Sequence, residues 1–253
     1  IIFASNWQLQ DFVNKLGIPQ SEKLDVMENP IEPFEVVEKD KDKVNLIYFS
    51  TPHRGLEILV PVFERICERH ENVHLNVFSS FKIYGWEDKD KDFEPLYEQI
   101  RNHPQMTYHG FKPNQELREF LNTAHIFAYP SIWTETSCRA MLESMSAGLV
   151  CVHPNLGALP ETSGSLNIMY HSDMENKNTH ANIFASNLLA AIKLIREKNQ
   201  TNMINFNKVY VDSRYNIDFI KNKWNLMLKN LLTEYATEES RKIPKEMFRY
   251  KVG

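Results

Sequence analysis

Residues 125–153, HIFAYPSIWTETSCRAMLESMSAGLVCVH, decide the fold of this chain. HIFAYPS (125–131) has the length and apolar content of a buried strand, and LVCVH (149–153) has the same character. Between them, CRAMLESMSAG (138–148) is typical of a helix that Gly148 closes. A strand, a helix and a strand at this short spacing predict a βαβ unit with two parallel strands.

The same alternation continues on both sides of this unit. We expect further strands at 44–50, 73–81, 106–110 and 166–170, and a short one at 1–5. We expect further helices at 6–16, 54–70, 93–103, 114–124 (with Asn114 as N-cap), 181–198 and 217–232. The predicted fold class is therefore α/β: a Rossmann-like, mainly parallel sheet with helices on both faces.

Composition and charge exclude several classes of protein. The formal net charge of -4 argues against a nucleic-acid partner, since general nucleic-acid binders are basic. No apolar run approaches the roughly 20 residues that a membrane span needs, and the first residues lack a signal-peptide pattern. Cys67, Cys138 and Cys151 are odd in number and match no zinc spacing, which indicates reduced thiols and a cytoplasmic location.

In sheets of this class, ligands bind beyond the carboxyl ends of the strands. Glu135 lies in such a loop, Thr136, Ser137 and Cys138 are expected to form the N-terminus of the next helix, and Glu143 follows roughly two turns later. The free N–H groups and the positive end of the helix dipole favour an anion there. The two carboxylates can accept hydrogen bonds from sugar hydroxyls. The pattern therefore favours a diphosphate with a sugar at either end.

With SAG (146–148) and the turn from Gly157 to Glu161, these residues resemble the retaining glycosyltransferases of the GT-B fold whose signature is Glu-x7-Glu, the family 4-like glycosyltransferases. IYFSTPHRGLEILVPVF (47–63) resembles the phosphate loop of that family, and YHGFKPNQELREFLNTAHIFAYPS (108–131) resembles its base-binding loop. The resemblance implies the C-terminal, donor-binding half of a GT-B fold.

The resemblance also implies roles for individual residues. Glu135, with the N–H groups after it, would hold the hydroxyls of the donor sugar, and Arg54 would pair with the diphosphate; these are the two expected catalytic residues. Glu143 would hold the ribose hydroxyls. The other expected donor-binding residues are Thr136, Ser137, Cys138, Gly110, Phe111, Lys112 and His53.

One position departs from the family's pattern. Many members carry an Arg-x4-Lys pair at the phosphate loop, whereas here Phe49 occupies the first position and Arg54 the second. One cation is missing, unless His53 or Lys112 replaces it. The expected role of Glu161 stays open between binding and capping the segment that follows it.

The activity implied is transfer of a sugar, of the hexosyltransferase type and with retention, from a nucleotide-diphosphate sugar to a glycan, lipid or protein acceptor. No cofactor and no metal would be required, because the arginine and the helix dipole stabilise the departing phosphate. The N-terminal domain of the same protein would be a partner and would supply the acceptor contacts. A chain without it would bind nucleotide and be inactive alone.

The chain opens without Met on IIFAS, which is typical of the middle of a buried strand, so we expect a fragment of a longer protein. The predicted division is 1–35 for the end of an N-terminal domain and the connector, 36–210 for the sugar-nucleotide-binding domain, and 211–253 for C-terminal helices and a loosely held tail.

Two alternatives from other classes remain. A Rossmann oxidoreductase predicts Gly-x-Gly-x-x-Gly after the first strand of the sheet, but STPHRG (50–55) has a single glycine. A non-catalytic nucleotide-sugar-binding module would tolerate loss of the two carboxylates, yet Glu135 and Glu143 are both present.

The acidic stretch EDKDKDFE (87–94) offers a possible metal site. Its Asp-x-Asp pairs resemble the metal-binding motif of GT-A glycosyltransferases, which conflicts with the rest of the pattern. A calcium loop fails because Phe93 replaces the required glycine and Gln99 falls where glutamate is needed. We therefore expect a solvated loop, which alternating acids and lysines usually form.

Overall fold

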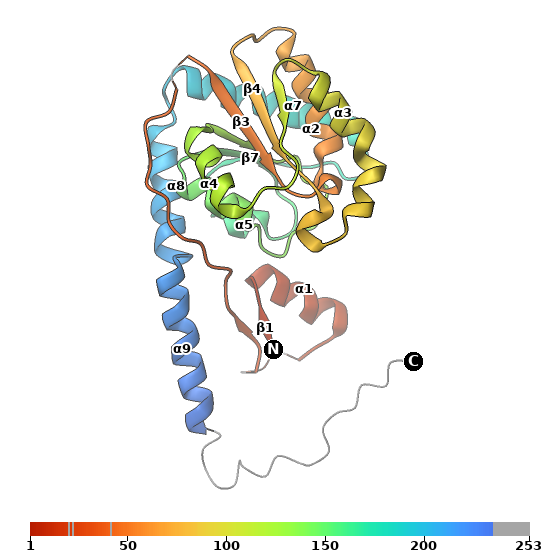
Figure 1. Cartoon of the computed structure of the whole chain (residues 1–253). Helices are drawn as coiled ribbons and strands as arrows, with labels where there is room; N and C mark the ends of the chain where they lie inside the picture. The colour runs from red at the N-terminus through yellow and green to blue at the C-terminus, as the bar shows by residue number, and fades with distance from the viewer. Residues whose placement is uncertain (20, 22, 41, 235–253) are drawn as a thin grey trace.

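The computed structural model describes residues 1–234 apart from residues 20, 22 and 41. The predicted tail, residues 235–253, lies outside the described residues. The described part contains a parallel sheet between two layers of helices, and a long helix that runs from these layers back along the N-terminal segment (Figure 1).

The sheet has six strands in the spatial order β5-β4-β3-β6-β7-β8, and every neighbouring pair is parallel. Its strands are β3 (Val44–Phe49), β4 (Val73–Phe78), β5 (Met106–Tyr108), β6 (Ile126–Ala128), β7 (Val150–Pro154) and β8 (Ile168–Tyr170). Leu46 in β3 lies opposite Leu75 in β4 on one side and Ile126 in β6 on the other. The strand order reverses between β3 and β6, which is where open α/β sheets place their ligands.

Helices cover both faces of this sheet, which confirms the predicted fold class. The helices that follow the strands are α2 (Leu56–Cys67), α3 (Glu94–Asn102), α4 (Asn114–Thr123), α5 (Arg139–Ser146), α6 (Leu159–Ser163) and α7 (Lys177–Arg196). The chain then continues through α8 (Thr201–Arg214) and α9 (Ile217–Glu234). α2 and α7 pack together on one face, while α5 lies on the other face against β7 and is covered by α8 (Figure 1).

The central strands are apolar on both sides because helices cover both. Leu46, Ile47 and Tyr48 of β3 are fully buried, as are Ile126 and Phe127 of β6. This double burial explains the continuous apolar runs in the sequence, since a strand with one solvated face would alternate. Packing on both faces fixes the strand ends, and hence the loops that follow them.

The N-terminal segment forms a small unit of its own. β1 (Ile2–Phe3) pairs in parallel with β2 (Asp25–Val26), and α1 (Asn6–Leu16) connects them. α1 has the predicted bounds, and Gly17 ends it in the left-handed conformation. The expected strand at 1–5 is shorter in the structure, and β2 was not predicted. α9 lies along this unit, where Lys223 donates to the carbonyl of Val26 and pairs with Glu28 at 2.6 Å.

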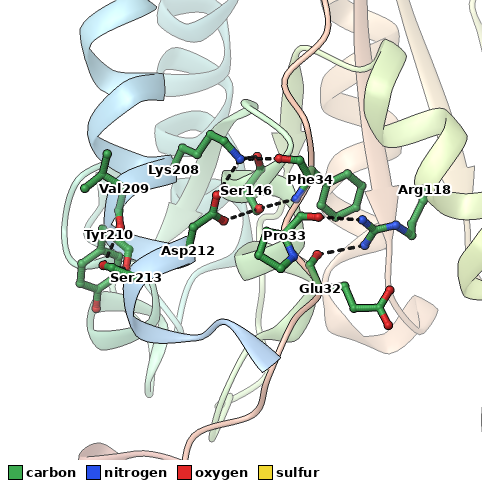
Figure 2. Close-up of polar contacts among 10 residues, drawn as sticks. All are labelled: Glu32, Pro33, Phe34, Arg118, Ser146, Lys208, Val209, Tyr210, Asp212 and Ser213. Carbon is green, nitrogen blue, oxygen red and sulfur yellow. Dashed lines mark hydrogen bonds and ion pairs between the residues drawn. The ribbon is translucent and has the colours of Figure 1, made fainter. Parts of the chain in front are cut away.

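The connector between this unit and the sheet is held from one side by α4. Arg118 donates to the carbonyl oxygens of Glu32 and Pro33, at 3.1 Å each (Figure 2). Its guanidinium carbon lies 3.6 Å from the centre of the Phe34 ring, within the range of a cation–π contact. One arginine therefore satisfies two backbone acceptors of the connector and stacks on its last aromatic residue.

From the other side the connector is held by α5 and α8 (Figure 2). The Phe34 N–H donates to Ser146 Oγ at 3.0 Å, and Lys208 donates to the Phe34 carbonyl. Asp212 accepts from both Ser146 and Lys208, at 2.5 and 2.6 Å, and so joins the two side chains. The predicted boundaries at residues 35 and 210 stay predictions, but the connector is fixed to the sheet-bearing part on both sides.

Several element boundaries differ from the sequence predictions. The last long helix of the sheet region begins at Lys177 rather than at residue 181, because the Asn176 side chain caps it by accepting from two backbone N–H groups. Asn114 is the first residue of α4 and not its N-cap, a position that Pro113 occupies. The sequence pattern does not delimit α8, which lies in the weakly patterned stretch after residue 198.

Candidate functional site

A cleft of about 410 Å³ lies beyond the carboxyl ends of the strands, at the point where the strand order reverses. Loops after β3, β4, β5 and β6 and the first turns of α5 line it. Seven of the predicted site residues share this lining: Arg54, Gly110, Phe111, Lys112, Ser137, Cys138 and Glu143. Glu135, Thr136 and His53 are not part of it. The ligand contacts predicted for all ten residues stay predictions.

Gly55 brings the loop after β3 against the loop after β6. Its φ of +114° is in the left-handed region, and a Cβ there would lie 2.1 Å from the carbonyl oxygen of Pro130. Only glycine allows this close approach. The contact places Arg54, the preceding residue, within reach of Glu135 in the other loop.

Two side chains, Glu135 and Tyr84, bond Arg54 directly, and Tyr129 in turn holds Glu135. Its Nη1 lies 2.7 Å from Glu135 Oε1, Tyr129 donates to the same oxygen at 2.5 Å, and Nη2 donates to the Tyr84 hydroxyl at 3.3 Å. Burial lowers the pKa of Arg54, but the Glu135 carboxylate and the two tyrosines outweigh burial and raise that pKa above its usual value. The cation is therefore fixed in position and permanently charged.

Glu135 itself is almost completely buried, at 4% exposed. It is not part of the cleft lining and pairs with Arg54, which is. Gly157 supports it: a Cβ at Gly157 would lie 2.6 Å from the Glu135 carbonyl oxygen, and the Ala158 N–H donates to that oxygen at 2.8 Å. The turn that begins at Gly157 thus packs on the backbone of Glu135.

Glu143 contributes a second carboxylate from the interior of α5. It is 4% exposed, and Arg139 Nε donates to its Oε1 at 3.1 Å. Burial raises the pKa of Glu143, and Arg139 offsets part of that rise. α5 begins at Arg139, with Cys138 as N-cap, so the predicted helix start at residue 138 differs by one residue, whereas Thr136 and Ser137 precede the helix. Thr136 is exposed instead.

Three residues of the cleft lining carry a buried polar atom without a hydrogen-bond partner among the described residues. The hydroxyls of Thr51 and Ser79 belong to nearly inaccessible residues, 4% and 2% exposed, and neither Oγ1 nor Oγ has a hydrogen-bond partner among the described residues. Arg54 Nε is unpaired in the same way. Since buried polar groups are nearly always hydrogen-bonded, these three atoms favour a polar ligand in the cleft.

His53, one of the two candidates for the cation that is missing at Phe49, is not part of the cleft lining. Its ring stacks on Phe81 at 5.2 Å and contacts Trp133 edge-on, outside the cleft. Burial, followed by the charges of Arg54 and a nearby lysine, lowers the pKa of His53. The structure therefore gives no support to His53 as the replacement cation, and its role in donor binding stays a prediction.

Lys112 does line the cleft, but it forms an i,i+4 ion pair with Glu116 at 2.9 Å. Arg139 is a third cleft cation, and it is absent from the sequence-predicted site. The sequence could have identified Arg139, because a cation at a helix N-terminus is unfavourable without an anion nearby. That argument applies to Arg139 at the start of α5 as much as to Arg54 before α2.

The acidic stretch forms a 3-10 helix, Glu87–Phe93, and is not simply a solvated loop. Asp90 accepts from Ser80 Oγ at 2.5 Å, from the Phe81 N–H at 2.9 Å and from the Tyr97 hydroxyl at 3.0 Å. Asp90 therefore holds the loop after β4 in shape. Within the described ranges, no three His, Cys, Asp or Glu side chains gather as metal ligands would.

Glu161 caps a helix, although not the one expected. Its carboxylate accepts from the N–H of Asn6 at 3.0 Å, from the Asn6 side chain at 2.8 Å and from the N–H of Trp7 at 2.8 Å. It therefore caps α1, in the N-terminal unit, rather than the segment that follows it. The turn Gly157 to Glu161 links the backbone of Glu135 to that unit.

The helices and the cysteines bear on membrane and disulfide chemistry. Over the described residues, no helix combines the length and the apolar character needed to cross a bilayer. Cys67, Cys138 and Cys151 are all unpaired, and the latter two are buried.

The sequence of this chain is similar to curated glycosyltransferase subunits. A phosphatidylinositol N-acetylglucosaminyltransferase subunit of Arabidopsis thaliana is 32% identical over 108 residues, 43% of this chain and 23% of that protein. The chain matches between about a quarter and a third of the length of its curated relatives.

Solved structures share the fold. A glycosyltransferase from Rickettsia africae superposes with a TM-score of 0.73 at 14% identity, covering 91% of this chain and 63% of that one. Anabaena HepE, in complex with UDP and glucose, superposes with a TM-score of 0.63 at 15% identity, covering 90% and 62%.

Residues 30–188 match the family model of the "Glycosyl transferases group 1". That match includes all six strands of the large sheet and every residue of the cleft wall. The chain belongs to the group 1 family of glycosyl transferases.

Proposed function

We propose that this chain binds a nucleotide-diphosphate sugar in the cleft and forms the donor-binding half of a glycosyltransferase that works with retention. The observation that carries the proposal is the arrangement around the start of α5. A fixed, permanently charged Arg54 and the unpaired hydroxyls of Thr51 and Ser79 line the same cleft as Glu143. Cations, hydroxyl donors and a carboxylate together suit a diphosphate attached to a ribose.

In the proposed mechanism the diphosphate lies against Arg54 and the N-terminus of α5. Both stabilise the negative charge that develops as the glycosidic bond to the phosphate breaks. Glu135 acts on this charge through Arg54, which it holds in place at 2.7 Å. Glu143 accepts from the ribose hydroxyls and fixes the nucleotide along the cleft. The acceptor enters on the face that the nucleotide leaves, and this gives retention.

The relatives suggest which substrates to test. Because the Arabidopsis relative is named for N-acetylglucosamine transfer to phosphatidylinositol, we propose UDP-N-acetylglucosamine as donor and a phospholipid headgroup as acceptor. The relatives are also named as subunits, so we propose that a further domain or chain supplies the acceptor contacts. The three unpaired thiols support a cytoplasmic location.

Ligand-induced thermal stabilisation tests donor binding on this chain. UDP, GDP, ADP and NAD are added separately, and the melting temperature is measured. We expect a nucleoside diphosphate to raise it and NAD to leave it unchanged. A rise with NAD alone would favour the oxidoreductase alternative, and no rise with any of the four would contradict the proposal.

Transfer and stereochemistry need an assay of the protein together with its acceptor-binding partner. A panel of sugar nucleotides is screened for nucleoside diphosphate release, and the anomeric configuration of the product is read by NMR. An α-linked product from an α-linked donor supports retention. A β-linked product would contradict retention without affecting donor binding, and binding without any release would favour the non-catalytic alternative.

A further inference from the structure

The cleft lacks a cation at the end of β3. Phe49 occupies the position where the family resemblance places an arginine. It is 9% exposed, and its ring packs on Phe127 of β6 at 5.1 Å. A charged side chain in this apolar contact would be costly. Position 49 is thus part of the core, and the charge has to come from elsewhere if the diphosphate is to be held by two cations.

Arg139 is placed to supply that charge. It is the first residue of α5, it lines the cleft, and its side chain is 56% exposed. Of its donors, only Nε has a partner among the described residues, Glu143 Oε1 at 3.1 Å. The two terminal nitrogens of the guanidinium therefore remain able to donate. These are the groups that bind phosphate oxygens in a bidentate manner.

Arg54 and Arg139 line the same cleft, Arg54 from the loop after β3 and Arg139 from the start of α5. The positive end of the helix dipole destabilises a cation at the start of α5, and the Glu143 carboxylate offsets that cost only in part.

The unpaired hydroxyls give independent support for an anion here. Thr51 follows β3 and Ser79 follows β4, and both line the cleft with their oxygen atoms buried and without partners among the described residues. A phosphate oxygen is an acceptor that two hydroxyl donors can share with a guanidinium. Three features therefore indicate an anion at this place: the start of α5, the Thr51 hydroxyl and the Ser79 hydroxyl.

We propose that Arg139 is the second cation of the diphosphate site and takes over the charge that Phe49 cannot carry. This inference rests on the proposed function, since it assigns a residue to the donor site described there. Arg54 binds the diphosphate from the β3 side, Arg139 binds it from α5, and the hydroxyls of Thr51 and Ser79 donate to its oxygens.

A different role for Arg139 makes a different prediction. If Arg139 only orients Glu143, substitution of Arg139 weakens the binding of every ligand that contains ribose, with or without phosphate. If Arg139 binds the diphosphate, the substitution weakens binding more for ligands that carry more phosphate charge. Comparing a nucleoside with its diphosphate therefore separates the two roles.

The experiment uses calorimetric titration of this chain with UDP, UMP and uridine, or with the matching guanosine or adenosine series if the wild type prefers it. The variants are Arg139→Leu and Arg139→Lys. The matched control is Lys177→Leu. Lys177 is also the first residue of a helix and is also paired with a glutamate, Glu57 at 2.8 Å, but it lies outside the cleft.

We expect Arg139→Leu to weaken UDP binding by about tenfold or more, the effect of losing one charge-assisted hydrogen bond, and uridine binding by less than about twofold. Arg139→Lys should give an intermediate loss, and Lys177→Leu none. Melting temperatures of all variants show that each is folded.

Equal losses for UDP and uridine would overturn the proposal in favour of a role through Glu143, and unchanged UDP binding would overturn it outright. Both outcomes leave the proposed function standing, because the wild type still binds the diphosphate. A wild type that binds none of the three nucleoside diphosphates would instead overturn the proposed function, and this inference with it.

Discussion

Arg54 and Glu135 form an ion pair of 2.7 Å although 81 residues separate them in the sequence. The pair joins the loop after β3 to the loop after β6, the two central strands between which the strand order reverses. Its carboxylate is buried and its guanidinium faces the cleft. The acidic residue thus serves to hold a cation at the site, and the two side chains act as one unit.

Because they act as one unit, loss of either side chain should have nearly the same consequence. We predict that Arg54→Ala and Glu135→Ala each lower turnover at least ~100-fold, the effect of losing one charge-stabilising group. The double variant should lose little more than the worse single variant. The assay is nucleoside diphosphate release by the protein with its acceptor-binding partner.

Arg101→Ala is the control, because its ion pair with Glu94 at 2.6 Å lies on the surface. Near-normal turnover in Arg54→Ala or Glu135→Ala would refute the role assigned to that residue. Strictly multiplicative losses in the double variant would show that the two act independently.

Glu143 should make stability depend on pH. Burial raises its folded pKa above the ordinary value of 4.5, so between these two values the folded protein binds more protons than the unfolded chain. The free energy of unfolding should therefore fall as the pH rises through this window, relative to Glu143→Gln. Urea unfolding of both proteins at a series of pH values measures the difference, and a constant difference would contradict the assignment.

The same carboxylate should make donor binding depend on pH. Protonated Glu143 accepts fewer hydrogen bonds from ribose, so the affinity for UDP-N-acetylglucosamine, whose two phosphates keep their charge, should fall as the pH drops through the raised pKa. Glu143→Gln should bind more weakly at pH 7 and lose this pH dependence. A wild type and a variant with parallel pH profiles would assign the titration to another group.

Gly55 should tolerate no side chain. Gly55→Ala places a Cβ 2.1 Å from the Pro130 carbonyl oxygen, so the two loops must separate. Gly17→Ala is the matched control, because Gly17 also has a positive φ and no atom lies within 4 Å of the added Cβ. We expect about 1 kcal/mol of destabilisation for Gly17→Ala and at least about 2 kcal/mol more for Gly55→Ala, from chemical unfolding. Equal costs would show that the close approach is unimportant.

Glu161 should stabilise α1 from a distance of 155 residues in sequence. Glu161→Ala removes the acceptor for the N–H groups of Asn6 and Trp7, a loss of about 1 kcal/mol for a capping side chain. Amide exchange in α1 should accelerate, while exchange in the central strands stays unchanged. Unaltered exchange in α1 would show that the Ser5 cap, which accepts from Gln8, is sufficient alone.

Much of the fold could be predicted because both faces of the sheet are covered. Strands such as β3 and β7 are apolar at all positions but one, and Gly17 and Gly148 mark the ends of the helices before them. β2 and α8 could not be predicted well. β2 is two residues long, and α8 has little apolar periodicity, because Asn207 and Val211 are its only fully buried residues.

The membership of the cleft could be predicted more fully than its geometry. Spacing after the strands located Arg54 and Glu143, which share the cleft lining. It could not show that Glu135 pairs with Arg54, because that contact depends on the Gly55–Pro130 approach. Nor could it show that the pKa of His53 is lowered, since that shift depends on its burial in the fold.

The central claim is that Arg54 presents a fixed positive charge to a diphosphate in this cleft. Calorimetric titration of UDP into wild type and Arg54→Ala at two salt concentrations tests it most directly. The account predicts that the wild type binds, that the variant binds at least about tenfold more weakly, and that its affinity depends less on salt. Equal affinities and equal salt dependence in the two proteins would contradict it.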